Sequence, residues 1–149
     1  MTRRAQPGSK LGKRDRELIA AATAAIKARY RDDWQEVGAA LRTRSGKIFT
    51  GVNLDAYLGR MAVCAEAVAL GRAVVEIGDA GIDTIVAVRH PPPTEDDQTI
   101  AVVSPCGACR ELIFDYDPKA HVIVPNGAAA KVVPIAELLP NKYRRGSQG

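Results

Sequence analysis

Cysteine is scarce in this sequence, which has three cysteines among 149 residues. A small protein stapled by disulfides needs more cysteines and an even number of them, so the count argues against a disulfide framework. Three free thiols fit a reducing compartment, and we expect the protein to be cytoplasmic. The two histidines, His90 and His121, form no short metal-binding motif, and we assign no function to either.

Long apolar runs are also missing. No stretch is long and apolar enough to span a bilayer, and no apolar segment of a secretory signal follows the charged residues 1–7. We therefore expect no membrane association. The apolar fraction of 46% and the charged fraction of 26% are ordinary for a globular protein, and a chain of this length forms one domain with a buried core.

Aromatic residues make up only 5% of the chain, and basic residues gather at its two ends. Residues 1–14 contain five basic side chains and residues 142–149 contain three, with no acidic residue in either segment. This leaves 13 basic and 17 acidic side chains in residues 15–141, a net charge of −4. Such a body lacks the basic groove and the aromatic platforms that bind polynucleotides, so we expect no nucleic-acid partner.

The basic ends are predicted to lie outside the folded domain. We expect residues 1–13 to form a disordered tail, residues 14–143 to form the domain, and residues 144–149 to form a flexible C-terminal tail.

Apolar periodicity predicts the elements of the domain. The predicted helices cover residues 14–30, 62–77 and 106–116, with a last helical turn at 135–139. The predicted strands cover residues 34–44, 47–53, 84–88, 121–124 and 131–134, and residues 100–103 are extended. This order predicts a three-layer α/β/α sandwich on a mixed five-stranded sheet. Because the link between the last two strands is too short for a parallel crossover, these strands should be antiparallel.

All three cysteines lie in two short motifs, Val63–Ala67 (VCAEA) and Ser104–Arg110 (SPCGACR). Cys106 and Cys109 have the spacing of a pair that binds one metal ion, and Cys64 can supply a third thiolate. Zinc favours thiolates in tetrahedral geometry, so we expect one Zn²⁺ per chain. Three protein ligands leave one position open for water, which is typical of a catalytic site. A closed structural site would need a fourth ligand, for which only the two histidines are available.

Glu66 lies two residues after Cys64, beside the expected open position. A C-A-E motif followed at a distance by P-C-x-x-C is the signature of zinc deaminases, with cysteine in place of the first histidine. The alternative for Glu66 is a solvated carboxylate at a helix start. From Val37 to Pro140 the sequence resembles the cytidine deaminase family in its small three-cysteine form, including the blasticidin-S deaminase branch.

This resemblance implies that residues 14–143 catalyse zinc-dependent hydrolytic deamination of a free cytosine nucleoside, in a homo-oligomer that is a tetramer in the family. Zinc would activate water, and Glu66 would move the protons. Three residues depart from the family pattern: Gln35 replaces a phenylalanine that packs on the pyrimidine, and Ala67 and Ala108 replace arginines. A nucleoside analogue such as blasticidin S therefore remains an alternative substrate. A polynucleotide-editing deaminase and a non-catalytic zinc module rank below both.

The resemblance also implies substrate-binding residues. Asn53 and Asp55 resemble the Asn-x-Glu pair that holds the ribose hydroxyls, although both residue types also suit a turn after a strand. The backbone carbonyls of Ala65 and Ser104 are expected to accept hydrogen bonds from the substrate amine. Tyr143 resembles an aromatic residue that closes the site of a neighbouring subunit.

Three thiolates and one Zn²⁺ sum to a charge of −1, and two arginines lie close enough in sequence to offset it. We expect Arg60, four residues before Cys64, to donate to a thiolate as an outer partner of the metal. We expect Arg110, directly after Cys109, to face outward. The alternative is that both arginines are surface charges and that the helix N-termini suffice.

Overall fold

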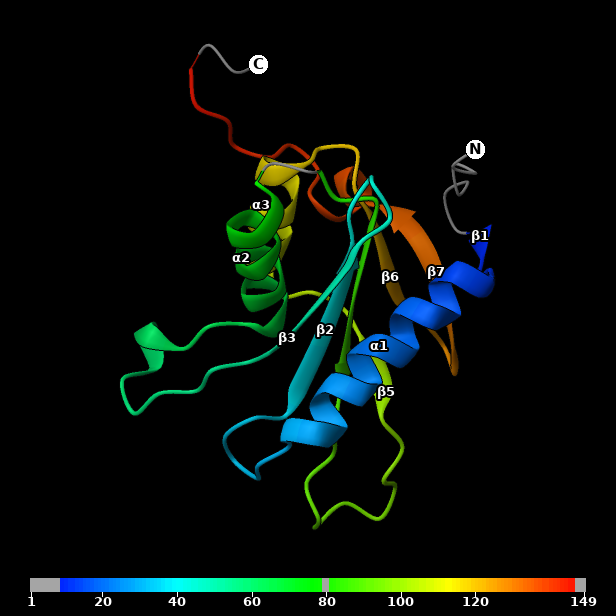
Figure 1. The fold of residues 1–149 in the computed structure, drawn as a ribbon, viewed down its shortest axis with the longest axis vertical. Coiled ribbons are helices and arrows are strands. Elements are labelled where there is room, and N and C mark those ends of the chain that lie inside the picture. Colours follow the sequence, from blue (N-terminus) through cyan, green and yellow to red (C-terminus); the bar gives the residue numbers. More distant parts are fainter. Residues whose placement is uncertain (1–8, 79–80, 147–149) are drawn as a thin grey trace.

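The computed structural model describes residues 9–78 and 81–146. In this part of the chain a mixed sheet lies between one helix on one face and two helices on the other (Figure 1). The α-helices are α1 Lys13–Arg29, α2 Ala65–Ile77 and α3 Gly107–Tyr116. The predicted three-layer α/β/α sandwich is therefore confirmed.

The sheet has the strand order β1-β7-β6-β4-β2-β3, and β5 pairs with β4. The strands are β1 Ser9–Lys10, β2 Val37–Arg42, β3 Ile48–Val52, β4 Thr84–Arg89, β5 Ala101–Val103, β6 His121–Asn126 and β7 Ala129–Pro134. Strands β4 and β6 are parallel and the other pairs are antiparallel, so the sheet is mixed. The predicted antiparallel pairing of the last two strands is confirmed by the β6–β7 pair.

The sheet is wider than the predicted five strands, because β1 and β5 add to it. Both are too short to show the alternation by which a strand is recognised from sequence. The predicted tail 1–13 is also only partly outside the fold: residues 9 and 10 pair with β7, and α1 begins at Lys13. Residues 1–8 and 147–149 of the predicted tails lie outside the described residues.

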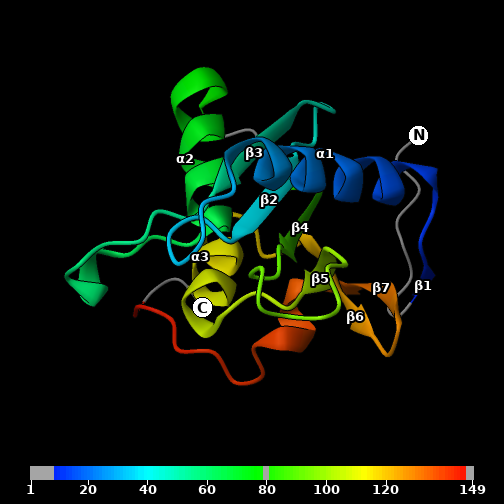
Figure 2. The same ribbon diagram turned by 90° about the horizontal axis from the view of Figure 1, so that it is seen from below.

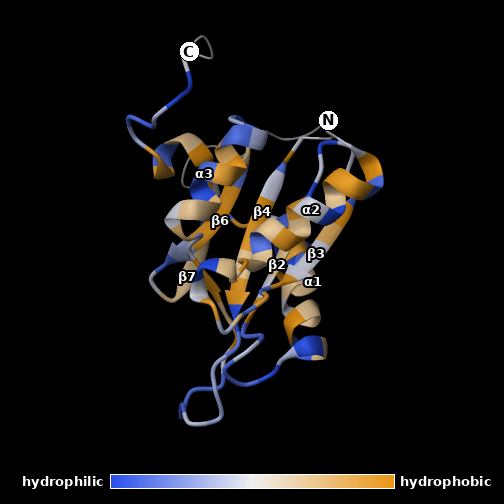
Figure 3. Ribbon diagram, turned by 90° about the vertical axis from the view of Figure 1, so that its left-hand side faces the viewer, coloured by the Kyte–Doolittle hydropathy of each residue, from blue (hydrophilic) through white to orange (hydrophobic). Residues whose placement is uncertain are grey.

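Each face of the sheet packs against its own helical layer, because successive strand residues point to opposite faces. On one face α1 covers Ala40 and Val86, which lie in one core cluster with Leu18 and Ile26 of the helix. The neighbouring strand residues belong to the second core cluster, under α2 and α3. Figure 3 looks onto α2 and α3 with the largely hydrophobic strands behind them. These two helices carry the cysteine motifs, so the candidate site belongs to this layer.

The second helix begins at Ala65, three residues later than predicted. Residues 53–64 form an arm that projects from the domain, with the 3-10 helix η1 Gly59–Met61 at its tip (Figures 1 and 2). At the base of the arm Leu54 and Val63 exchange two backbone hydrogen bonds, of 2.9 and 2.8 Å. This bridge brings the segment after β3 alongside the approach to α2. Val63, which lies within the predicted helix 62–77, is exposed and belongs to the arm instead.

None of the helices formed by residues 9–78 and 81–146 combines the length and the apolar composition that crossing a bilayer requires.

Candidate metal centre

The two cysteine motifs meet where α2 and α3 begin. Cys64 and Cys106 are the N-cap residues of these helices, both with extended backbone, and Cys109 lies in the first turn of α3. The three sulfur atoms lie within 4.8 Å of one another, and the Cys64 and Cys106 sulfurs are 3.4 Å apart. Unpaired N–H groups and the positive end of the helix dipole at both N-termini favour negatively charged sulfur.

This geometry fits zinc. Four ligands at about 2.3 Å in a tetrahedron place neighbouring sulfurs about 3.8 Å apart, close to the spacing of this cluster. Neither histidine belongs to the cluster, and in the described part of the chain the cluster is made of the three cysteines alone. The ligand set therefore matches an open site with three protein ligands and not a closed four-ligand site.

The three thiols differ in exposure and in acidity. Cys106 is exposed, Cys64 is half-buried and Cys109 is buried. Burial raises the pKa of Cys109, and the nearby Glu66 carboxylate raises it further; burial and the contact with Cys106 also raise the pKa of Cys64. Burial works against ionisation of Cys106 too, but the hydrogen bond from the Cys109 backbone N–H and the two other thiols lower its pKa. A cation that binds all three sulfurs as thiolates therefore has to displace protons on binding.

Glu66 points into this cluster from the first turn of α2. Its side chain is buried, with 6% of its surface exposed, and Oε2 lies 3.6 Å from the Cys109 sulfur. Burial raises the pKa of the Glu66 carboxyl, although its own backbone N–H and the Cys109 thiol partly oppose the shift. The alternative of a solvated surface carboxylate is therefore wrong. A buried carboxyl that points at three candidate metal ligands is placed to accept and return protons at such a site.

Asn53 lies directly after β3, and its side chain forms most of its hydrogen bonds with backbone groups of the protein. Its Oδ1 accepts the backbone N–H groups of Glu36 and Val37, at 2.9 and 3.0 Å, and its Nδ2 donates to the Trp34 carbonyl at 2.9 Å. One amide N–H remains for a ligand. Asp55 is exposed and accepts the backbone N–H of the next residue. Through the Leu54–Val63 bridge, the backbone around both residues runs alongside the residues that precede α2.

The two backbone carbonyls expected to meet the substrate amine differ. A Cβ atom built on Gly51 would lie only 2.7 Å from the Ala65 carbonyl oxygen, so this carbonyl packs against β3. The Ser104 carbonyl, just after β5, accepts no backbone hydrogen bond from any described residue. The geometry favours Ser104 over Ala65 as the acceptor. Tyr143 is 80% exposed and therefore stands free to meet another molecule.

The structure contradicts the expected outward orientation of Arg110, whereas the role expected of Arg60 stays a prediction. Arg60 is exposed at the tip of the arm and makes no hydrogen bond or ion pair with the described residues, so no donation to a thiolate is seen. Arg110 is half-buried instead of facing outward: its Nε donates to the Pro105 carbonyl at 2.9 Å and its Nη1 to the Leu138 carbonyl at 3.3 Å. The two helix N-termini are thus the positive groups aimed at the sulfurs.

The inward orientation of the Arg110 side chain could have been predicted from the geometry of helix side chains. An angle of about 100° between neighbouring helix residues describes where the Cβ atoms point. Long side chains on a helix lean back towards its N-terminus, which for Arg110 is the segment that carries Cys106.

Comparison with known proteins gives a consistent picture. A family model described as cytidine and deoxycytidylate deaminase zinc-binding region matches residues 12–124. Blasticidin-S deaminase from Bacillus cereus is 50% identical over 136 residues, which make up 91% of this chain and 96% of that protein. A cytidine deaminase from Sporosarcina psychrophila is 30% identical over 111 residues, 73% of this chain and 75% of that protein. The crystal structure of a cytidine deaminase from Burkholderia pseudomallei matches with a TM-score of 0.68 and 30% identity, covering 86% of this chain and 98% of that chain.

Proposed function

Because the chain belongs to the cytidine and deoxycytidylate deaminase family, we propose that it is a zinc-dependent hydrolase acting on a free cytosine nucleoside. The reaction converts cytidine or deoxycytidine and water into uridine or deoxyuridine and ammonia. One observation carries the proposal: the buried carboxylate of Glu66 lies 3.6 Å from a sulfur of a three-cysteine cluster at two helix N-termini. In this arrangement the Glu66 carboxylate, which can carry protons, lies next to three metal ligands that would leave a fourth position on the metal for water.

The residues have distinct roles in this reaction. Cys64, Cys106 and Cys109 would hold one Zn²⁺, which supplies the Lewis acidity that activates water. Glu66 accepts a proton from the attacking water and delivers it to the ring nitrogen, while the remaining hydroxide adds to the carbon that bears the amine. Glu66 then takes the proton of this added hydroxyl and passes it to the amine. The carbon–nitrogen bond breaks, ammonia leaves and the carbonyl of the product forms.

Substrate binding falls to the residues around this centre. The remaining amide N–H of Asn53 and the carboxylate of Asp55 would hold the sugar hydroxyls. The Ser104 carbonyl would accept from the substrate amine, and Ala65 would do so only if its carbonyl turned away from β3.

The proposal also includes the domain, the compartment and the oligomeric state in which the reaction takes place. We place the activity in residues 9–143, in a cytoplasmic homo-oligomer, a tetramer by resemblance, in which Tyr143 closes a neighbouring site. The reaction class is that of pyrimidine salvage.

Blasticidin S is the second candidate substrate. The specific observation in its favour is the 50% identity to a blasticidin-S deaminase along 96% of that protein. The chemistry at the metal centre would be the same, since the amine to be replaced stands on the same kind of ring. What differs is the group attached to the ring, which the residues around Asn53 would contact.

Ammonia release from the zinc-loaded protein tests the proposal and separates the two candidates. The substrates to compare are cytidine, deoxycytidine, blasticidin S and a cytosine-containing single-stranded oligonucleotide, each by its kcat/KM. Turnover of cytidine or deoxycytidine supports the main proposal, and turnover of blasticidin S alone supports the second. Turnover of the oligonucleotide alone, or of none of the four, contradicts both.

A further inference from the structure

Arg110 holds the chain on both sides of the metal ligand Cys106. Its backbone N–H donates to the Cys106 carbonyl at 2.9 Å, and its side-chain Nε donates to the Pro105 carbonyl, also at 2.9 Å. The two peptide groups that flank the Cys106 α-carbon are therefore both bound by one residue. Cys106 itself is exposed and is the N-cap of α3, so its carbonyl accepts the first helical hydrogen bond, whereas the Pro105–Cys106 peptide before it lies outside the helix.

The other end of the guanidinium contacts a partly buried segment that packs against the core. Its Nη1 donates to the carbonyl of Leu138, the last residue of the 3-10 helix η2 Ile135–Leu138. Ile135, which opens η2, is fully buried, and its N–H donates to the Ala120 carbonyl at 2.9 Å. Arg110 thus connects the exposed side of the metal centre to a segment that begins with a buried residue.

We propose that Arg110 is a positioning residue for the metal: it keeps the Cys106 sulfur within the cluster by fixing the Pro105–Cys106 peptide against η2. The proposal rests on the zinc-dependent function argued above. It assigns Arg110 a geometric role, because its donors reach main-chain carbonyls and not sulfur. Outer partners that orient metal ligands typically change metal affinity by about 10–100-fold when removed.

A geometric role and a charge role predict different substitution patterns. Arg110→Met keeps the length of the stem and removes every N–H donor. Arg110→Lys keeps the positive charge but replaces the planar fork with a single ammonium group, which is a poor substitute where two carbonyls are bridged. If position matters, both variants should bind zinc more weakly than the wild type. If charge alone matters, the lysine variant should behave like the wild type.

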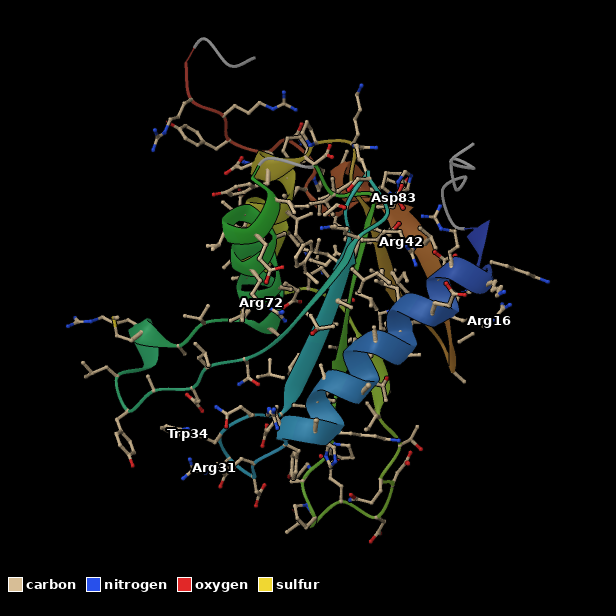
Figure 4. The ribbon with its side chains drawn as sticks, in the orientation of Figure 1. Arg16, Arg31, Trp34, Arg42, Arg72 and Asp83 are labelled. Carbon is tan, nitrogen blue, oxygen red and sulfur yellow. The ribbon has the colours of Figure 1, made fainter. Side chains whose placement is uncertain are left out.

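Arg16 offers a matched control (Figure 4). Like Arg110, it sits near the start of a helix, and its side chain reaches back to a main-chain carbonyl five residues earlier, Leu11, at 3.1 Å. It belongs to α1, the helix on the opposite face of the sheet from the cysteine cluster. Arg16→Met therefore removes the same kind of contact without touching the metal centre, and its zinc affinity should equal that of the wild type.

The experiment measures zinc affinity of the four full-length proteins by competition with a chromogenic chelator. The absorption spectrum of the cobalt(II)-substituted proteins then reports the ligand geometry. We expect about 10–100-fold weaker zinc binding and a changed cobalt spectrum for Arg110→Met, a smaller loss for Arg110→Lys, and no change for Arg16→Met. Binding by Arg110→Met within twofold of the wild type would overturn the proposal, as would full recovery in Arg110→Lys.

Two further outcomes are a variant that does not fold and a wild type that binds no zinc. If Arg110→Met does not fold with zinc present, Arg110→Lys alone decides: weakened zinc binding supports the proposal, and wild-type binding overturns it. If the wild-type protein binds no zinc, the proposed function fails, whereas a wild type with one zinc and an unaffected Arg110→Met variant removes only the role of Arg110.

Discussion

Glu66 shows how a common residue acquires a specific role from its surroundings. Most glutamates at helix starts are solvated, but this one is buried against the Cys109 sulfur, where the N-termini of α2 and α3 meet. Burial raises the pKa of its carboxyl above the usual value for a glutamate. The sequence predicts this role from its two-residue offset from Cys64.

Replacing Glu66 by glutamine should remove turnover and leave the metal in place. The amide has nearly the same size as the carboxyl but carries no proton to the reacting groups. Since each general acid–base step contributes about 10²–10⁴-fold and Glu66 serves more than one, we expect kcat to fall by at least about 10³-fold. The measurement is ammonia release at a matched zinc content. A variant that keeps a tenth of the wild-type rate would remove Glu66 from the proton path.

Asn53 should matter for stability as well as for binding. Asn53→Ala leaves two backbone N–H groups and one carbonyl around Trp34–Val37 without their partner. Losing half-buried hydrogen bonds of this kind costs about 1–3 kcal/mol of unfolding free energy, measured by urea denaturation. The control is Asp55→Ala, which removes only an exposed contact and should cost less than about 0.5 kcal/mol. Equal effects of the two variants would show that the Asn53 contacts are not structural.

At the scale of elements, the metal centre depends on how closely α2 approaches the edge strand β3. Gly51 makes this approach possible, because a Cβ atom there would lie 2.6 Å from the Ala69 nitrogen and 2.7 Å from the Ala65 carbonyl oxygen. Arg72 of α2 adds a contact from the outside, donating to the Thr50 carbonyl at 2.9 Å (Figure 4). The first turn of α2, which carries the Glu66 carboxylate, is therefore placed by β3.

Gly51→Ala should displace this first turn. Distances below 3.0 Å to backbone atoms cannot be relieved by a side-chain rotation, so the helix has to shift. Strain of this kind typically costs about 1–3 kcal/mol, and we expect lower thermal stability together with weaker zinc binding. Gly59→Ala is the matched control, since nothing lies within 4 Å of a Cβ atom at that position. If Gly51→Ala is as stable and binds zinc as tightly as Gly59→Ala, the close approach is not essential.

The elements also show what the sequence can and cannot reveal. Long periodic segments such as α1 are predicted to within one residue at each end, and the cysteine spacing predicts the three sulfurs that the fold brings together. The arm at 53–64 and the late start of α2 are missed, because a local pattern does not show the bridge between Leu54 and Val63. For Arg110 the contact with Pro105 follows from the lean of a long helix side chain, but its second partner, Leu138, is 28 residues away in sequence and leaves no local pattern.

For the whole molecule, the metal should link the two helices to each other and so stabilise the fold. Cys64 belongs to the start of α2, and the other two ligands belong to α3. Removing zinc with a chelator should leave these helix ends without their common partner. A ligand present at about 1,000 times its dissociation constant contributes about 4 kcal/mol, which corresponds to a loss of roughly 10 °C in Tm for a chain of this size.

Calorimetry with and without chelator checks this expectation. The control is Cys64→Ala, which should melt near the chelated wild type and should gain little from added zinc. An unchanged melting temperature of the wild type after chelation would show that the metal does not brace the two helices.

The proposed function depends on three cysteines that hold one zinc with a fourth position open to water. Zinc-edge X-ray absorption of the purified full-length protein measures these ligands. We expect one zinc per chain, with three sulfur neighbours at about 2.3 Å and one oxygen neighbour at about 2.0 Å. A protein without zinc, or a zinc with four protein ligands and the multiple-scattering signature of a histidine ring, would contradict it.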